Sequence, residues 1–313
     1  RIFKLRLVGC FMLDGLMGYG ERDKGPDTAL LTLSLLIMML VLISETGSLE
    51  ASQTQEQVAT SSMVPDWVLV SFRLLCAALV CITLSWVVLD PKGGSDFPLH
   101  LKEREMLPRD VVGPTRLAAF TMWHFALIGI SFGLSGTASL IHSTGGTVPQ
   151  WILVASPILF SASYSCAILV TFVVTFRLIP DNLERGLPVG NFFSWYEILM
   201  HNGNIVILGI SLFVNGMDVQ WHYFAYPILF GIAYVAWAAV YANFISGVFI
   251  YDFLDYRMRG APLIHVVLLL IIGLSFTVVF ALDRMSEWSV LPAALLAMAM
   301  TWRITTFREP AHG

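Results

Sequence analysis

The sequence predicts an all-α integral membrane protein, a polytopic bundle of about eight transmembrane helices with both termini in the cytoplasm. Of the 313 residues, 57% are hydrophobic and only 13% are charged, and the mean hydropathy is +0.74. A soluble core of this size could not hide so much apolar surface from water. Apolar runs close to the length of about 20 helical residues that crosses a bilayer core also recur along the chain.

Eight apolar runs are candidate spans. They are Thr28–Ile43, Trp67–Leu89, Leu117–Ile141, Trp151–Ile179, Trp195–Val214, Tyr226–Ile250, Leu263–Leu282 and Trp288–Trp302. The first and the last are shorter than a bilayer core requires of a straight helix. The last run therefore has two interpretations, an eighth crossing or an interfacial or re-entrant helix.

The basic residues supply the orientation. Of the 18 Lys and Arg residues, all except Arg73 and Arg284 precede the first run, follow the second, fourth, sixth and eighth runs or, like Arg177, lie in the last turn of the fourth. The loops 44–66, 142–150 and 215–225 contain none. Because basic residues collect in loops that stay cytoplasmic, this alternation favours eight crossings and two cytoplasmic termini.

The chain divides into four parts. We expect 1–27 to be a cytoplasmic N-terminal segment, either amphipathic at the membrane interface or a disordered tail. Residues 28–66 form an extra first span with an acidic outer loop, 67–282 a six-span core, and 283–313 a short last span with a cytoplasmic tail. The true N-terminus cannot be inferred, because the sequence starts at Arg1.

Polar residues recur at one depth of the predicted bundle. Thr121 and His124 in the third span, and His201 and Asn204 in the fifth, lie one to two turns from the cytoplasmic surface at a rise of about 1.5 Å per residue. Each pair has i,i+3 spacing and so shares a helix face. Polar groups at this depth should point into the bundle, towards a partner or a wet cavity.

Further polar residues from neighbouring spans reach the same leaflet. They are Tyr241, Asn243, His265 and Glu197. A hydroxyl close to an imidazole is the minimum for a nucleophile with its general base. The alternative is structural: Thr121 bonds its own helix backbone while the histidines and asparagines cross-link helices.

Arg73 is the one basic residue well inside a predicted span, and we expect it to form an ion pair with Asp66 or Asp218 at the outer rim. The spans contain no Lys, which excludes a retinal Schiff base, and no pattern with metal-ligand spacing occurs. Three histidines alone are weak evidence for a haem. We expect no cofactor, no metal and, without a basic cluster, no nucleic-acid partner.

Three stretches together resemble a known family. They are FTMWHFALIGISFGL at 120–134, MHNGNIVILGISLF at 200–213 and HYFAYPILFGIAYVAWAAVYANFISGVFIYDFLDY at 222–256. Their order and spacing are similar to the androgen-induced-gene family and its rolling-stone relatives, over about 67–282. The resemblance implies a six-span core, and in the androgen-induced branch it implies hydrolysis of fatty acid esters of hydroxy fatty acids by an intramembrane threonine and histidine.

Carried over by position, the family threonine falls on Thr121 and the first histidine of its H-G-M-H stretch on His201. The family's catalytic histidine position holds Asn204 here. An asparagine amide accepts no proton at neutral pH, so His201 or His124 would have to serve as the base, with Asn204 as an oxyanion donor. This departure favours the rolling-stone relatives, for which the resemblance implies no reaction.

The first hypothesis is therefore a multi-pass membrane scaffold or interaction subunit with a lipid-accessible polar pocket. The second is an intramembrane threonine hydrolase of lipid esters, and the third is a small transporter or channel. A water-accessible cavity that joins Thr121 to an imidazole would favour the hydrolase. Expected partners are membrane lipids, with other membrane subunits or a homo-oligomer left open, in a plasma membrane or endomembrane that the sequence does not distinguish.

Overall fold

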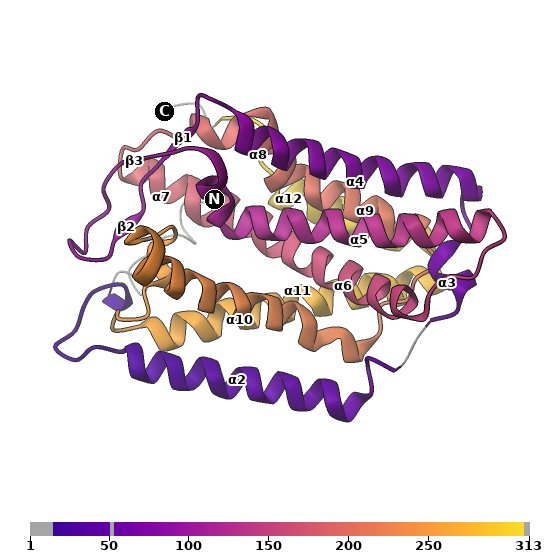
Figure 1. The fold of residues 1–313 in the computed structure, drawn as a ribbon, viewed down its shortest axis with the longest axis horizontal. Coiled ribbons are helices and arrows are strands. Elements are labelled where there is room, and N and C mark those ends of the chain that lie inside the picture. Colours follow the sequence, from indigo (N-terminus) through magenta and orange to yellow (C-terminus); the bar gives the residue numbers. More distant parts are fainter. Residues whose placement is uncertain (1–14, 51–52, 310–313) are drawn as a thin grey trace.

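The computed structural model describes residues 15–50 and 53–309 as a helical bundle (Figure 1). Residues 1–14, and with them about half of the predicted N-terminal segment, lie outside the described residues. Within the described part, seven helical stretches are long and apolar enough to cross a membrane. They are Gly25–Thr46, Asp66–Leu89, Phe120–Ser143, Gln150–Glu184, Trp195–Val214, Trp221–Ser246 and Ala261–Trp288. The prediction of a multi-pass helical membrane protein is confirmed.

The first four stretches contain the helices α2, α4, α5, α6 and α7. Their bounds are α2 (Gly25–Thr46), α4 (Asp66–Leu89), α5 (Phe120–Ser143), α6 (Gln150–Val173), a π-helical turn η2 (Val174–Leu178) and α7 (Ile179–Glu184). A short helix, α3 (Gln55–Ala59), lies in the loop between α2 and α4. Its N-terminus is fixed by a capping box, in which the side chains of Thr54 and Gln57 each accept the other residue's backbone N–H.

The remaining stretches contain the helices α8 to α12. They are α8 (Trp195–Ile198), the π-helical turn η4 (Leu199–Gly203), α9 (Asn204–Val214), α10 (Ala225–Val240) after the 3-10 turn η5 (Trp221–Phe224), the π-helical turn η6 (Tyr241–Ser246), α11 (Ala261–Trp288) and α12 (Val290–Ile304). A further apolar helix outside the seven stretches, α12, has 15 residues. It packs against α11 and α9.

α12 returns the chain from one end of the bundle to the other. Near its start, the Asp283 carboxylate accepts a hydrogen bond from the Val219 backbone N–H at 2.9 Å. Beyond its end, the Asn202 side chain donates to the Thr306 carbonyl at 2.9 Å and accepts from the Thr306 N–H at 3.1 Å. Fifteen residues at a rise of about 1.5 Å span about 22 Å.

α6 lies at the centre of the bundle and α2 at its edge (Figure 1). In the most apolar window, 78% of the residues of Gln150–Glu184 are buried, against 11% of those of Gly25–Thr46. Ser156, Ser161, Ser163 and Ser165 on α6 are fully buried. Small residues at these positions let α6 pack closely against α5, α9, α10 and α11.

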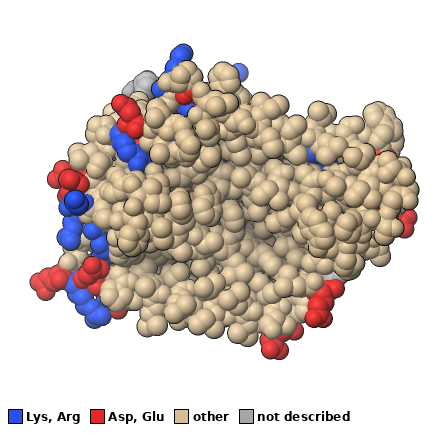
Figure 2. Space-filling model, in the orientation of Figure 1, with Lys and Arg blue, Asp and Glu red and all other residues tan. Residues whose placement is uncertain are grey.

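One end of the bundle carries most of the charged side chains, as Figure 2 shows. At this basic end, the connection between α4 and α5 carries three short strands, and β1 (Gly94–Asp96) pairs antiparallel with β3 (Arg109–Val111) within it. Its other strand, β2 (Leu99–His100), pairs antiparallel with β4 (Val248–Phe249) of the loop between α10 and α11. A 3-10 turn, η1 (Gly113–Ala118), then leads into α5.

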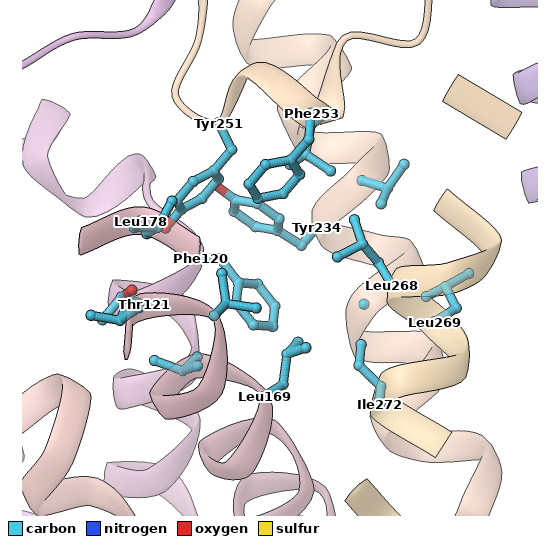
Figure 3. A pocket seen from close by; sticks show the side chains of 16 residues that line it. Phe120, Thr121, Leu169, Leu178, Tyr234, Tyr251, Phe253, Leu268, Leu269 and Ile272 are labelled. Carbon is cyan, nitrogen blue, oxygen red and sulfur yellow. The ribbon is translucent and has the colours of Figure 1, made fainter. Parts of the chain in front are cut away.

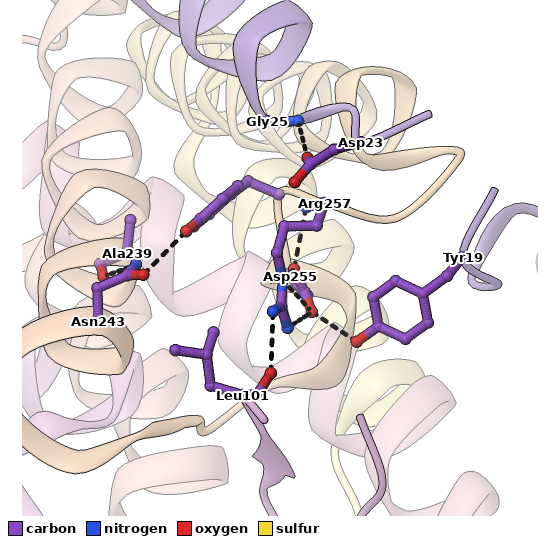
Figure 4. Close-up of polar contacts among 9 residues, drawn as sticks. Tyr19, Asp23, Gly25, Leu101, Ala239, Asn243, Asp255 and Arg257 are labelled. Atoms are coloured by element: carbon purple, nitrogen blue, oxygen red, sulfur yellow. Dashed lines mark hydrogen bonds and ion pairs between the residues drawn. The ribbon is translucent and has the colours of Figure 1, made fainter. Parts of the chain in front are cut away.

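The N-terminal segment of the described chain is held against the loop between α10 and α11. The Tyr19 hydroxyl donates to the Asp255 carboxylate at 2.7 Å, and Arg257 forms an ion pair with the same carboxylate at 2.6 Å (Figure 4). The backbone N–H of Arg259 also donates to the Gly18 carbonyl at 2.9 Å. We call residues 15–24 with these contacts the N-terminal latch.

Candidate functional site

Two cavities lie at the basic end of the bundle and meet at Thr121. The larger, which we call the polar cavity, has a volume of about 290 Å³. Its walls include the loops 93–97 and 188–192, and its chemically active lining residues are Thr121, Glu197, His201, Arg109, Arg116, Tyr196 and Tyr251. The Thr121 hydroxyl, the His201 imidazole and the Glu197 carboxylate, all singled out from the sequence, thus line one cavity.

The Glu197–His201 pair is positioned by a local irregularity of the helix. Glu197 ends the α8 region, and the π-helical turn η4 carries His201 one turn further on. The Glu197 carboxylate lies 3.4 Å from His201 Nδ1, and the Thr171 hydroxyl donates to the His201 carbonyl at 2.6 Å. π-helical turns are frequent at functional sites. The Glu197–His201 contact is within ion-pair distance but does not have hydrogen-bond geometry.

Thr121 opens α5 and is buried, yet it lines both cavities. Its hydroxyl makes no bond to the backbone of its own helix in the described part of the chain, whereas the Thr137 hydroxyl on the same helix donates to the Gly133 carbonyl at 2.8 Å. Thr121 instead shares the lining of both cavities with Tyr251. The Thr121 hydroxyl therefore does not serve its own helix backbone in the way that the Thr137 hydroxyl does.

The smaller cavity, which we call the apolar cavity, has a volume of about 70 Å³. Figure 3 shows Thr121 and Leu178 on one side of it and Leu269 and Ile272 on the other, with Phe120 between them. Its lining is almost wholly hydrocarbon and aromatic. Thr121, Leu178 and Tyr251 belong to both cavities and form the junction between them.

Arg116 and Tyr251 were missed as site residues because the sequence placed them at the membrane surface. Arg116 donates to the Val87 carbonyl at 2.7 Å and to the Tyr196 hydroxyl at 2.9 Å. Burial raises the pKa of the Tyr251 phenol above its ordinary value, and the neighbouring Thr121 opposes that rise. The phenol is therefore a neutral donor at physiological pH. The only available signal for Tyr251 was its place at the end of the third family-like stretch.

His124 and Asn204 turn away from the cavities. His124 is fully buried, and its Nε2 lies 3.0 Å from the Ser163 carbonyl on α6. The Asn204 side-chain oxygen accepts from the Thr171 hydroxyl at 3.2 Å and from the Ile205 N–H at 2.6 Å. Neither residue lines either cavity. The i,i+3 spacing correctly indicated helix faces but not the direction in which each face points.

Three other predicted pocket residues also lie outside the two cavities. Asn243 is exposed, donates to the Ala239 carbonyl and accepts from the Tyr256 hydroxyl (Figure 4). Tyr241 is buried against Trp237, with ring centroids 5.7 Å apart. His265 is buried near the start of α11.

The structure corrects the expected ion pair at the outer rim. Arg73 contacts no carboxylate in the described residues; its Nη1 donates to the Val58 carbonyl at 2.8 Å, the Ser135 carbonyl at 3.0 Å and the Ser139 hydroxyl at 2.7 Å. Asp66 is exposed, and the Asp218 carboxylate accepts from the Gln57 amide at 3.0 Å. The Val58 carbonyl of helix α3 accepts the hydrogen bond from Arg73 that the sequence had assigned to a carboxylate.

The residues described contain no group of three or more His, Cys, Asp or Glu side chains arranged to hold a metal ion. The fold and the cavities define a multi-pass helical membrane protein with a polar site at its basic end. No protein-family model, curated protein or solved structure matches the chain.

Proposed function

We propose that this protein is an intramembrane hydrolase of lipid esters, with Thr121 as nucleophile, His201 as general base and Glu197 as the group that orients His201. One observation carries the proposal: Thr121 lies where a polar cavity holding the Glu197–His201 pair meets an apolar cavity. An ester bond between a polar group and a hydrocarbon chain fits such a junction. A scaffold predicts a tightly packed site at this place instead.

The reaction follows from the roles of these side chains. His201 Nε2 accepts the Thr121 proton while the hydroxyl oxygen attacks the ester carbonyl, and the imidazolium then protonates the departing alcohol. Water activated by His201 hydrolyses the acyl-threonine, which releases the acid and restores Thr121. Both proton transfers require His201 Nε2 within about 2.6–3.2 Å of the reacting oxygen in the substrate complex.

Glu197 and Tyr251 complete the site. A carboxylate 3.4 Å from His201 Nδ1 stabilises the imidazolium that forms when Thr121 loses its proton. Tyr251 lies beside Thr121 and carries a neutral phenol, which makes it the donor to the developing oxyanion. It takes the role that the sequence assigned to Asn204, whose side chain lies off the cavity.

The proposal includes a topology. The basic end faces the cytoplasm, because Lys and Arg gather there (Figure 2). The short helix α12 is then an eighth crossing, both termini are cytoplasmic, and the polar cavity receives water from the cytoplasmic side. Membership of the androgen-induced and rolling-stone group is part of the same proposal, and membrane lipids are the expected partners.

Covalent labelling with a fluorophosphonate probe tests the function directly. The wild-type protein in detergent should form an adduct, Thr121→Ala should lose it completely, and His201→Gln should slow its formation by at least about 100-fold. Thr137→Ala, on the lipid-facing side of the same helix, is the matched control and should label like wild type. Equal labelling of wild type and Thr121→Ala would contradict the hydrolase proposal and favour the scaffold hypothesis.

A further inference from the structure

The far wall of the apolar cavity contains a glycine in the interior of a transmembrane helix. Gly231 on α10 lines the cavity together with Leu269 and Ile272 of α11. A Cβ on residue 231 would lie 2.6 Å from Ile272 Cδ1 and 2.9 Å from Leu269 Cδ2. Glycine weakens a helix interior, and here its missing side chain leaves the space that the ends of Leu269 and Ile272 occupy.

The cavity has a direction relative to the nucleophile. Thr121 lies on one side and Leu269 and Ile272 on the other (Figure 3). An acyl carbonyl attacked by Thr121 would therefore direct its hydrocarbon chain into the apolar cavity, with the chain end towards Gly231. The polar part of the ester would stay in the polar cavity.

The volume limits how much chain the cavity can hold. One water-sized group needs about 10–15 Å³ measured in this way, so about 70 Å³ holds roughly five such groups, and a methylene is similar in size. A longer chain must displace the flexible ends of the Leu269 and Ile272 side chains. These ends lie next to Gly231, the one glycine in the lining of the cavity.

Resting on the proposed function, we propose that the apolar cavity binds the unbranched acyl chain of the substrate ester and that Gly231, Leu269 and Ile272 set the chain length. Chains of about five carbons fit the cavity as it stands. Longer chains depend on the freedom of the Leu269 and Ile272 side chains. Branched or ring-bearing acyl groups are excluded by the narrow lining of Phe120, Leu169 and Tyr234.

The experiment measures hydrolysis of p-nitrophenyl esters from acetyl to dodecanoyl. Gly231→Ala should lower kcat/KM more for octanoyl and longer esters than for the acetyl ester, by about fourfold for each methylene that no longer fits. Ile272→Ala should shift the preferred chain two or three carbons longer. Gly273→Ala, also on α11, is the matched control. An added Cβ there would lie 3.0 Å from the Phe224 ring, which does not line the cavity, so this variant should keep the wild-type chain-length profile.

A second measurement separates this inference from the proposed function. Binding of hexanoate to dodecanoate to Thr121→Ala, and to the same variant with Ile272→Ala, is followed by titration calorimetry. A shift to longer chains in the double variant supports the acyl site even if no ester is hydrolysed. Identical chain-length profiles in wild type, Gly231→Ala and Ile272→Ala, in both hydrolysis and binding, would overturn it.

Discussion

The two ends of the bundle use a buried arginine in different ways. At the end opposite the basic end, Arg73 is fully buried and holds helix α3 through the Val58 carbonyl, while the Ser139 hydroxyl donates to the Ala59 carbonyl at 2.8 Å. At the basic end, Arg116 is 8% exposed and lines the polar cavity. The nearest carboxylate to Arg116, that of Asp90, lies 3.7 Å away.

The difference shows how one fold packs the interior tightly around an arginine at one end and leaves a cavity beside an arginine at the other. The inserted helix α3 brings the Val58 carbonyl to Arg73, and α5 brings the Ser135 carbonyl and the Ser139 hydroxyl, so the guanidinium joins two helices. The loop between α4 and α5 instead covers Arg116 with short strands and ion pairs such as Arg109–Asp96 at 2.7 Å. Polar side chains beneath that cover, including Glu197 and His201, keep a cavity of about 290 Å³.

The largest effect should come from removing Arg73. Arg73→Ala leaves three acceptors without their donor, and hydrogen bonds to a charged group contribute about 1.5–3 kcal/mol each. Since removal also relieves the buried charge, we expect a net loss of about 3 kcal/mol and a fall in Tm of about 6 °C or more in detergent. The measurement is thermal unfolding followed by tryptophan fluorescence.

Arg284→Ala tests whether that loss is specific to burial. Arg284 lies at the same end with its side chain 40% exposed, paired to Glu287 at 2.7 Å. The surface pair with Glu287 contributes about 1 kcal/mol at most. Arg284 also pairs with the largely buried Asp283 carboxylate at 2.8 Å, so we expect a loss above that of a surface pair but below that of Arg73→Ala. Equal destabilisation by the two substitutions would contradict the closing role of Arg73.

A smaller effect should follow at the basic end from Glu197→Gln. The amide keeps the shape of the side chain but removes the charge 3.4 Å from His201, so the imidazolium is less stable in the transition state. We expect kcat for ester hydrolysis to fall about 10- to 100-fold with little change in Tm. Glu287→Gln at the opposite end, where the side chain is 46% exposed, is the control, and a similar loss of kcat there would contradict the role assigned to Glu197.

The smallest effect should come from the N-terminal latch. Tyr19→Phe removes the hydrogen bond to Asp255 but keeps the ring beside Arg104, whose guanidinium lies 4.5 Å from it. We expect a loss of about 1 kcal/mol, measured as faster proteolysis of residues 15–24. Tyr256→Phe, which loses only an exposed bond to Asn243, should have a weaker effect.

The pH dependence of the latch has a defined sign. Burial raises the pKa of Tyr19, and the hydrogen bond to Asp255 raises it further. A raised pKa in the folded state means that the stabilisation is complete below the unfolded value, about pH 10, and is lost as the pH rises above it. The difference in proteolysis between wild type and Tyr19→Phe should therefore shrink above about pH 10, and a difference that grows would contradict the contact.

The transmembrane stretches could be predicted because apolar length is a local property of the sequence. The boundaries were less accurate where the backbone changes conformation. The third run was expected from Leu117, but the 3-10 turn η1 delays α5 to Phe120. The sixth was expected to reach Ile250, but Gly247 takes the left-handed conformation with φ +73° and ends the helical stretch at Ser246.

The candidate site was predicted in part for the same reason. Depth along a helix follows from counting residues, so Thr121, Glu197 and His201 were expected at one level, and all three line the polar cavity. His124 has the same depth but faces the Ser163 carbonyl on α6. Residue counting fixes height in the membrane and leaves the rotation of each helix undetermined.

By itself, the sequence determined that this protein is a multi-pass helical bundle and that polar groups gather near one leaflet, because hydrophobic length and the side-chain repeat are written in consecutive residues. Only the tertiary structure decided which of those groups meet. The rotation and packing of α5, α6 and α9, together with the loops that cover Arg116 and supply Tyr251, depend on contacts between residues far apart in the chain. Those contacts place Thr121 at the junction of two cavities and close the opposite end around Arg73.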